Sequence, residues 1–338
     1  MKAHETNPTR TLMQMINGYR LTQMIHVAAK LEIADLLKNG AQHSNDLARA
    51  TGTDSSSLYR LLRALAGAGI LSMSEEENFS LTPLGELLRQ DSPASLWGWA
   101  ITSSEPSVWQ AWGDLLYSVK TGETGFRHVH GISNWEYREK HPEANAIFNQ
   151  ALASGSRARA NALVKYTFAP AHLIVDVGGG HGTNLAAILV KNPALRGILF
   201  DQPHVTSGAM ETLRSAGASD RCEIIGGDFF KAVPAGGDIY LLSYIIHDWD
   251  DDSAIAILRN CQQAMANRGR VMLFERIVPQ NPQDGLGAFL ADLNMLVNTG
   301  GRERTTDEYQ TLFAKAGLDM VRVVPLDSDH AIYEAKRV

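Results

Sequence analysis

The chain has 338 residues, a formal net charge of −6 and 44% hydrophobic residues. This length exceeds what one hydrophobic core usually supports, so we expect two domains or one domain with a large appendage. The negative charge and the lack of a long basic run disfavour nucleic acid as a partner, because binding to phosphates needs clustered Lys and Arg.

The only cysteines are Cys222 and Cys261. Two cysteines are too few for a disulfide framework, and they lack the paired spacing of a zinc site. The first ten residues are polar, without the apolar core of a signal peptide, and no later segment has the length and apolar character needed to cross a bilayer. These features predict a cytoplasmic protein without a membrane partner.

The first predicted elements are helices. Apolar residues recur at helical intervals over residues 11–37, which indicates one or two amphipathic helices. Ser44 is placed to cap a short helix that Gly52 ends, and a second helix is predicted over residues 56–66. This region has the outline of a helix-turn-helix.

A hairpin is predicted next, over residues 70–81, with three consecutive glutamates at its turn. Helices followed by a hairpin predict a winged-helix-like domain, which we assign to residues 1–100. Residues 101–160 are predicted to be a helical linker that contributes to a substrate pocket. Five of the six tryptophans lie in or near this linker, and such aromatic density is more typical of a core or a subunit interface than of a pocket for a flat ligand: Trp97, Trp99, Trp109, Trp112 and Trp135.

From Leu173 onward, short apolar runs alternate with helical stretches, which predicts a mostly parallel sheet with helices on both faces. The last two runs have no helix between them and should pair antiparallel. The predicted strands are residues 173–177, 197–200, 222–225, 239–243, 271–276, 321–325 and 331–335. We assign residues 161–338 to this second, α/β domain.

A glycine-rich segment, DVGGGHG, follows the first of these strands and runs from Asp176 to Gly182. Glycines at a strand-to-helix turn let the backbone approach a ligand closely. A nicotinamide fingerprint would place glycine where Thr183 stands, so the spacing is instead that of methyltransferases, and it predicts S-adenosylmethionine as the cofactor. The residues predicted to contact it here are Asp176, Gly178, Gly179, Gly180 and Gly182.

Acidic residues also follow the next two strands. Asp201 is placed to accept hydrogen bonds from ribose hydroxyls. In the segment GGDFF, Gly227 precedes Asp228, whose carboxylate is placed to hold the adenine amino group beside the flat face of Phe229. Aspartate at a strand end is often only a helix cap, but three signals at successive strand ends favour a cofactor site.

The fourth strand ends in LLSYIIHDWDDDS. With DVGGGHG, FDQP, GDFF and the later GGRERT, this segment resembles the caffeate-type (plant-type) small-molecule O-methyltransferase family, in its bacterial secondary-metabolite branch. The resemblance covers nearly the whole chain. It implies a Rossmann-like class I methyltransferase sheet with an antiparallel C-terminal hairpin, S-adenosylmethionine as the cofactor, and a homodimer formed through the N-terminal domain.

The same resemblance implies the catalytic residues. The histidine matching His247 takes the proton from a substrate hydroxyl, and the residues matching Glu275 and Glu303 orient it. An unperturbed imidazole titrates near about 6.5 and a phenol near about 10, so we expect a neutral His247 that can assist without being locked in its protonated form. The acidic run at residues 250–252 is more typical of a helix start than of a metal site, and we assign no metal.

The resemblance also implies acceptor and cofactor contacts on other elements. Plant members often have Lys where this chain has Ser243, so this cofactor contact differs or is made by backbone. Members often have Met where this chain has Leu152. Asn294 is the best candidate for a hydrogen bond to the acceptor, whereas Met295 is equally well explained as core filling. The full predicted acceptor set is Phe148, Leu152, Asp248, Asn294, Met295 and Asn298.

The leading functional hypothesis is methylation of a hydroxyl on an aromatic small molecule, such as a phenol, phenazine or polyketide, in secondary metabolism such as antibiotic biosynthesis. The nearest alternative is an N-methyltransferase of the same fold acting on a heteroaromatic metabolite. A protein that kept the cofactor fold but lost catalysis is a further alternative. A DNA-binding ligand sensor is disfavoured because residues 41–91 contain four basic and seven acidic residues. The identity of the acceptor stays open.

Overall fold

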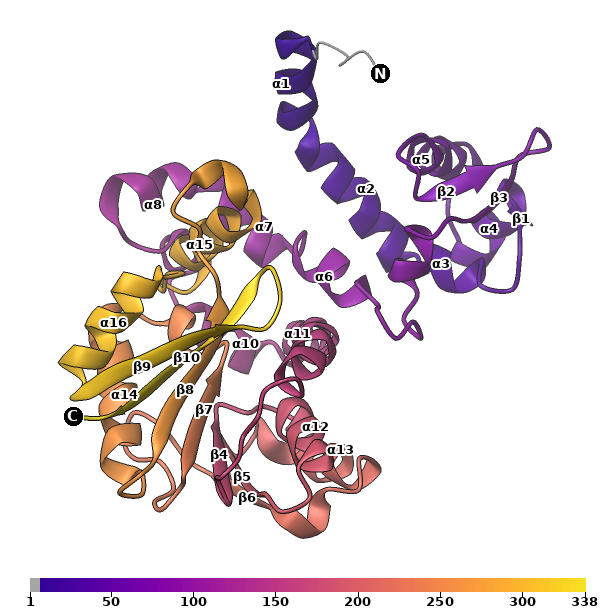
Figure 1. The fold of residues 1–338 in the computed structure, drawn as a ribbon. Coiled ribbons are helices and arrows are strands. Elements are labelled where there is room, and N and C mark those ends of the chain that lie inside the picture. The colour runs from indigo at the N-terminus through magenta and orange to yellow at the C-terminus, as the bar shows by residue number, and fades with distance from the viewer. Residues whose placement is uncertain (1–6) are drawn as a thin grey trace, which may run out of the picture. The chain divides into compact units, whose positions relative to one another are not determined.

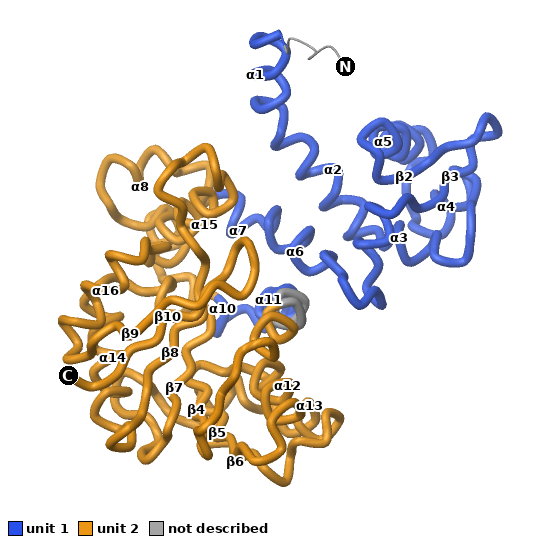
Figure 2. Tube along the Cα trace, in the orientation of Figure 1, with its two compact units in different colours: residues 1–110, 138–154 blue, residues 111–137, 155–338 orange. Residues whose placement is uncertain are grey.

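The computed structural model describes residues 7–338, with the side chains of residues 153–158 left aside. The chain forms two compact units (Figure 2). Unit 1 contains residues 1–110 and 138–154, and unit 2 contains residues 111–137 and 155–338. No helix in the described part of the chain is long and apolar enough to cross a membrane.

Unit 1 begins with the predicted amphipathic helices. The side chain of Asn7 accepts hydrogen bonds from the backbone N–H groups of Thr9 and Arg10, and Pro8 stands in the first turn, where its missing N–H costs nothing. Two helices follow, separated at Asn17, and the first of them has no buried residue: α1 (Pro8–Ile16) and α2 (Gly18–Lys30).

The helix-turn-helix elements follow as α3 (Ile33–Leu36), α4 (Ser44–Thr51) and α5 (Ser55–Gly67). Gly52 ends α4 in the left-handed conformation, as predicted. The prediction that Ser44 caps α4 is wrong by one residue: Ser44 is already helical, and the His43 ring accepts the hydrogen bond from the Asn45 N–H.

The predicted hairpin is confirmed as β2 (Leu71–Met73) and β3 (Asn78–Leu81), to which β1 (Gln42–His43) adds a third antiparallel strand. These elements enclose a core whose fully buried side chains include Leu47, Leu62 and Phe79. Short elements then extend the unit: η1 (Gly85–Leu88) and α6 (Trp97–Thr102). Each of the three boundaries between the units in the sequence falls inside a helix: α7 (Pro106–Gly113), α10 (Asn134–Lys140) or α11 (Pro142–Leu163).

Unit 2 is built on a seven-stranded sheet of order β6-β5-β4-β7-β8-β10-β9. The first five strands pair in parallel, and the last two form the predicted antiparallel hairpin, with β10 between β8 and β9. The strands are β4 (Leu173–Val177), β5 (Arg196–Asp201), β6 (Cys222–Gly226), β7 (Ile239–Ser243), β8 (Arg270–Arg276), β9 (Leu318–Pro325) and β10 (His330–Arg337).

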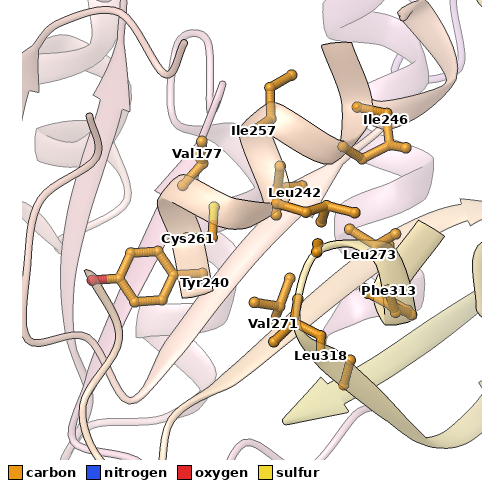
Figure 3. Packing of buried hydrophobic residues seen from close by; sticks show 14 of the residues in the cluster. Val177, Tyr240, Leu242, Ile246, Ile257, Cys261, Val271, Leu273, Phe313 and Leu318 are labelled. Atoms are coloured by element: carbon orange, nitrogen blue, oxygen red, sulfur yellow. The ribbon is translucent and has the colours of Figure 1, made fainter. Parts of the chain in front are cut away.

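Helices cover both faces of this sheet, with α14 and α16 on one face and α12 and α13 on the other (Figure 1). Alternate residues of one strand serve the two faces: Tyr240 and Leu242 pack with the α14 side (Figure 3), and Ile239 and Leu241 with the α12 side. The elements of unit 2 outside the sheet are α8 (Leu115–Thr121), α9 (Gly125–His130), α12 (Thr183–Lys191), η2 (Thr206–Gly208), α13 (Ala209–Ser215), η3 (Ser219–Arg221), η4 (Ile246–Asp248), α14 (Asp251–Ala264), η5 (Pro282–Asp284), α15 (Leu286–Asn298) and α16 (Thr306–Lys315).

The strand order reverses at β4, which pairs with β5 on one side and with β7 on the other. Open α/β sheets bind ligands at the carboxyl ends of the strands beside such a reversal. Asp201 is the last residue of β5, and the segments after β4, β6 and β7 contain the glycine turn, Asp228 and His247. The topology therefore places the residues singled out in the sequence at one edge of the sheet.

Candidate active site

The glycine turn between β4 and α12 adopts a backbone that other residues rarely take. Gly178, Gly180 and Gly182 all have positive φ angles, of 73°, 60° and 77°. A Cβ on Gly178 would lie 2.4 Å from Cδ1 of Ile245, so that position also lacks room for a side chain. Gly179 is equally confined, because its Cβ would lie 2.6 Å from a carboxylate oxygen of Asp176. At its glycines the turn thus presents backbone atoms without side chains, at the point where the strand order of the sheet reverses.

Two carboxyl groups flank this turn. Asp176 is only 1% exposed, and neither of its oxygens has a hydrogen-bond partner among the described residues. Burial first, and then the charge of Asp201, raise the pKa of Asp176 to about 7. Asp201 instead accepts hydrogen bonds from the N–H groups of Gly180 and Gln202, at 2.9 and 2.7 Å. An unpartnered buried carboxyl group beside a bare glycine turn fits a ligand rich in hydrogen-bond donors.

The other predicted cofactor residues lie on neighbouring strand ends. Asp228 is half-exposed and accepts a hydrogen bond from the Phe230 N–H. The ring of Phe229 packs edge-on against Trp249 at 5.9 Å, so it has a fixed orientation. Ser243, at the end of β7, accepts a hydrogen bond from Asn184 of α12. Gly227 lies against Phe200, which leaves no room for a Cβ.

His247 lies in η4, the short 3-10 turn that follows β7, and it is 7% exposed. Its Nδ1 lies 3.0 Å from Oε2 of Glu275 and 3.7 Å from Oε1 of Glu303, and its Nε2 lies 3.6 Å from Oδ1 of Asp248. Glu275 comes from the end of β8 and Glu303 from the loop after α15. The structure therefore brings the three predicted catalytic residues together with Asp248, which neighbours His247 in the chain.

The charges around His247 change its protonation. Burial acts to lower its pKa, but the carboxylates of Glu275, Asp248 and Glu303 outweigh burial and raise the pKa to about 10. Burial raises the pKa of Glu303 to about 7 and that of Asp248 to about 6. The expectation of a neutral imidazole with its ordinary pKa is therefore wrong. Its cause is the convergence of three carboxylates on one buried ring; the resemblance implied that Glu275 and Glu303 orient the ring, but not that their charges raise its pKa.

A second layer of residues holds the His247 turn in place. Oε1 of Glu275 accepts hydrogen bonds from the N–H groups of Ile245 and Ile246. The guanidinium of Arg304, which is 1% exposed, donates to the backbone oxygens of Ile246 and Trp249, at 3.0 and 2.8 Å, and to Asp251. The sequence patterns did not single out Arg304, although it lies in the segment GGRERT. Its signal was an arginine next to the predicted catalytic Glu303.

Gly301 was also missed. A Cβ on this residue would lie 2.0 Å from the backbone oxygen of His247 and 2.4 Å from the carbonyl carbon of Asp248. The following residue, Arg302, donates its backbone N–H to that same His247 oxygen at 2.8 Å. The loop after α15 thus lies directly against the backbone of the His247 turn, and only glycine permits this approach.

The predicted acceptor residues fall in two groups. Asn294 and Asn298, one turn apart on α15, are joined by a hydrogen bond, and Oδ1 of Asn294 also accepts from the indole of Trp112. Nδ2 of Asn294 is thus the atom of this side chain that can donate a hydrogen bond to the methyl acceptor. Met295 is half-buried, and its sulfur contacts Thr299. Phe148 and Leu152 lie on the part of α11 that belongs to unit 1, and their role in the acceptor pocket stays a prediction.

His247, Glu275 and Glu303 also meet a geometric criterion for metal ligation, since one ligand atom from each lies within 4.8 Å of the others. The nitrogen that faces both carboxylates is Nδ1, which lies at ion-pair distance, 3.0 Å, from Oε2 of Glu275. A protonated imidazole is one species that this separation from a carboxylate suits.

Comparison with known proteins decides the family. A family model described as an O-methyltransferase domain matches residues 112–319, and one described as an O-methyltransferase dimerisation domain matches residues 13–91. The chain belongs to the O-methyltransferase family. Its fold is accordingly that of a class I methyltransferase, its cofactor is S-adenosylmethionine, and its N-terminal region is a dimerisation domain.

The relatives of this O-methyltransferase act in secondary metabolism. The chain is 45% identical to a phenazine O-methyltransferase, PhzM, of Lysobacter antibioticus, over 97% of this chain and 96% of the relative. A solved structure titled LaPhzM has a TM-score of 0.94, at 44% identity, over 98% of this chain and all of that one (100%). A phenazine-1-carboxylate N-methyltransferase of Pseudomonas aeruginosa is 31% identical over 97% of each chain, so the N-methylating alternative also occurs among the relatives.

Replacing Gly301 with Ala should damage the active site more than the fold. The added Cβ must push the loop away from the His247 carbonyl, and a displacement of this kind at a catalytic turn costs about tenfold or more in kcat. The measurement is methyl transfer per folded protein, with folding checked by circular dichroism. Gly67→Ala is the matched control, since no atom lies within 4 Å of its Cβ. Wild-type turnover by Gly301→Ala would show that this contact does not position His247.

Asp176 should make the stability of the cofactor-free protein depend on pH. Its pKa rises from 3.8 to about 7 on folding, so between these values the folded state binds more protons than the unfolded state. The free energy of unfolding therefore falls as pH rises, by about 1.4 kcal/mol per pH unit from this group.

Asp176→Asn should remove that slope, so its stability relative to the native chain should increase from pH 5 to pH 8 in urea titrations. A pH-independent cost of burying the amide cancels in this comparison. Asp228→Asn, at a half-exposed position, is the control. Parallel curves for Asp176→Asn and the native chain would contradict the assignment.

Proposed function

We propose that the chain transfers a methyl group to a hydroxyl oxygen of a flat aromatic metabolite, with His247 as the general base. The observation that carries this proposal is the buried group formed by His247, Glu275 and Glu303 at the end of β7. A base is needed for O-methylation because a phenol carries a proton that must leave as the new O–C bond forms.

The cofactor is proposed to lie along the carboxyl ends of β4, β5 and β6. When bound, S-adenosylmethionine supplies an electrophilic methyl group. The glycine turn from Gly178 to Gly182 gives the cofactor a backbone surface, and Asp176 and Asp201 accept hydrogen bonds from its donors. Asp228 and Phe229 lie beside its adenine ring. The buried carboxyl group of Asp176 is the strongest structural support, since a folded protein seldom leaves such a group without a partner.

The raised pKa makes His247 a stronger base. A pKa of about 10 for His247 is close to that of an ordinary phenol, also about 10, so the proton can pass between them with little change in free energy. The cost is that most of the imidazole is protonated near neutral pH. Glu275 and Glu303 thus do more than orient the ring: their charges set the strength of the base.

The proposed acceptor is a fused aromatic compound of the phenazine type. This class rests on the relatives, which include a phenazine O-methyltransferase, and a solved O-methyltransferase of neocarzinostatin biosynthesis was obtained with S-adenosylmethionine and 2-hydroxy-5-methyl naphthoic acid. Asn294, Met295 and Asn298 on α15 are proposed to contact it, together with Phe148 and Leu152. Asp248 is proposed to contact the acceptor beside Nε2 of His247.

An N-methyltransferase acting on a heteroaromatic metabolite is the second candidate, because a relative is a phenazine-1-carboxylate N-methyltransferase. An aromatic ring nitrogen with a free lone pair needs no base, so the buried His247 group would have no proton to accept. This difference favours oxygen as the methylated atom.

The dimerisation domain is proposed to form a homodimer through residues 1–100. The observation that supports this is α1, which has no buried residue and exposes apolar side chains that a second copy would cover: Leu12, Met13, Met15 and Ile16. We further propose that the enzyme acts in the cytoplasm, without a metal, nucleic acid or membrane partner.

The pH profile should identify His247 as the base. Because only its neutral form accepts a proton, kcat/KM should rise with pH along a limb set by the raised pKa of His247. Glu275→Gln removes the carboxylate that contributes most to raising this pKa, so the limb should move to lower pH by about one unit or more. His247→Ala should lower kcat by about 10²–10⁴-fold with little change in cofactor affinity. Glu223→Gln, at an exposed position of β6, is the control. An unchanged profile in Glu275→Gln would reject this role.

The atom that receives the methyl group can be determined with S-adenosylmethionine that carries a ¹³C-labelled methyl group. The protein is incubated with 1-hydroxyphenazine, and the products are analysed by mass spectrometry and NMR. A labelled methoxy carbon is the expected product. Label on a ring nitrogen, with hydroxyl acceptors inert, would replace the proposal by the N-methylating alternative.

A further inference from the structure

Tyr244 stands in a strained position next to the proposed base. It is the first residue after β7, and its φ angle of 59° lies in the left-handed region that non-glycine residues rarely adopt. Its N–H donates to the backbone oxygen of Phe274, and its ring meets the His247 ring edge-on at 4.9 Å. Strain of this kind persists where the surrounding structure imposes it, and it is frequent at functional sites.

Two guanidinium groups lie beside this tyrosine. Cζ of Arg159, on α11, lies 4.6 Å from the centroid of the Tyr244 ring. Nε of Arg276, at the end of β8, lies 3.7 Å from Oε1 of Glu303. Burial raises the pKa of Tyr244, while the charges of Arg276 and Arg159 act to lower it. Two positive charges thus gather on one side of the His247 group.

Of the two neighbouring carboxylates, only Glu275 is hydrogen-bonded to the His247 turn. Glu275 accepts from the backbone of that turn with Oε1 and faces His247 with Oε2. Glu303 lies 3.7 Å both from Nδ1 of His247 and from Nε of Arg276, too far for a hydrogen bond to either. The buried Nε of Arg276 accordingly has no hydrogen-bond acceptor among the residues that the structure describes.

We propose that Arg276 and Arg159, together with Tyr244, bind a negatively charged oxygen of the methyl acceptor, on a substituent next to the hydroxyl that His247 deprotonates. The acceptor is then an aromatic hydroxy compound bearing an acidic group such as a carboxylate. This inference rests on the proposed function for the identity of the reacting hydroxyl. The anion site itself does not depend on methyl transfer, because it is formed by the side chains of this chain alone.

The chemistry of these residues suits such a group. A guanidinium presents several N–H donors in a plane that matches the two oxygens of a carboxylate, and a hydrogen bond to a charged group contributes more than one between neutral groups. A tyrosine hydroxyl donates a further hydrogen bond to an oxygen. Burial lowers the pKa of Arg159 and the charge of Arg276 adds to this effect, so a bound anion would favour the charged form of Arg159.

The test compares binding of two nearly isosteric compounds, 3-hydroxy-2-naphthoate and 3-hydroxy-2-naphthamide, by isothermal titration calorimetry at fixed ionic strength. The native protein should bind the carboxylate at least about tenfold more tightly than the amide. Arg276→Gln should lose most of this preference, with affinity for the amide changing less than about twofold. Arg159→Gln should show the same selective loss, and Arg276→Lys should keep part of the preference because the charge remains.

Arg214→Gln, on the exposed face of α13, is the matched control and should bind both compounds as the native protein does. Equal affinity of the native protein for the two compounds would overturn the proposal, as would an equal loss of both in Arg276→Gln. Binding is measured without methyl transfer, so failure of the anion site can be distinguished from failure of the proposed O-methylation. A protein that prefers the carboxylate but transfers no methyl group to oxygen would retain the anion site and lose only the proposed reaction.

Discussion

The structure of the site depends on one costly arrangement, the burial of His247 against three carboxyl groups. Each charged group loses hydration when it is buried, and only mutual pairing makes the arrangement tolerable. The pairing requires that η4, the end of β8 and the loop after α15 hold their positions closely. Arg304 and Gly301 meet this requirement from behind the turn, the first by hydrogen bonds to backbone oxygens and the second by leaving room for close contact.

The same arrangement gives the base its strength. A histidine with its ordinary pKa would be mostly neutral at pH 7 but a weak match for a phenol, whereas carboxylates raise its affinity for the proton. The carboxylates thus make His247 a stronger base, but they leave a smaller fraction of it unprotonated near neutral pH. Asp176 shows the opposite use of burial, since this carboxyl group has no positively charged or hydrogen-bonding partner among the described residues, and burial, followed by the charge of Asp201, raises its pKa. The pKa of His247 is raised by opposite charges, and that of Asp176 mainly by loss of hydration.

The sheet brings these two groups into one site. The glycine turn and η4 follow β4 and β7, which are neighbours although two strands intervene between them in the chain. Ile245, just before η4, fills the space against Gly178, so the proposed cofactor turn and the proposed catalytic turn are in direct contact. Helices α14 and α12, packed on opposite faces, fix the strands from both sides (Figure 1).

Local patterns in the sequence were sufficient for much of this protein. Apolar runs of strand length predicted all seven strands of the large sheet to within a few residues, because a short continuous apolar run is typical of a strand buried on both faces. The spacing of Gly178, Gly180 and Gly182 predicted a ligand turn because only glycine adopts its backbone readily. The segment around His247 identified the family, and with it the fold and the cofactor.

Only the tertiary structure decided the properties that depend on convergence. The raised pKa of His247 comes from residues separated by up to 56 positions in the chain, and no local pattern reports how many carboxylates meet one ring. The roles of Arg304 and Gly301 are contacts with backbone atoms of another segment, which leave no periodic signal. The contact of Arg159 with the Tyr244 ring likewise joins a helix to a strained turn, and the approach of Arg276 to Glu303 joins a strand end to the loop after α15. Backbone conformation is encoded locally, whereas electrostatic environment is set by what folding brings together.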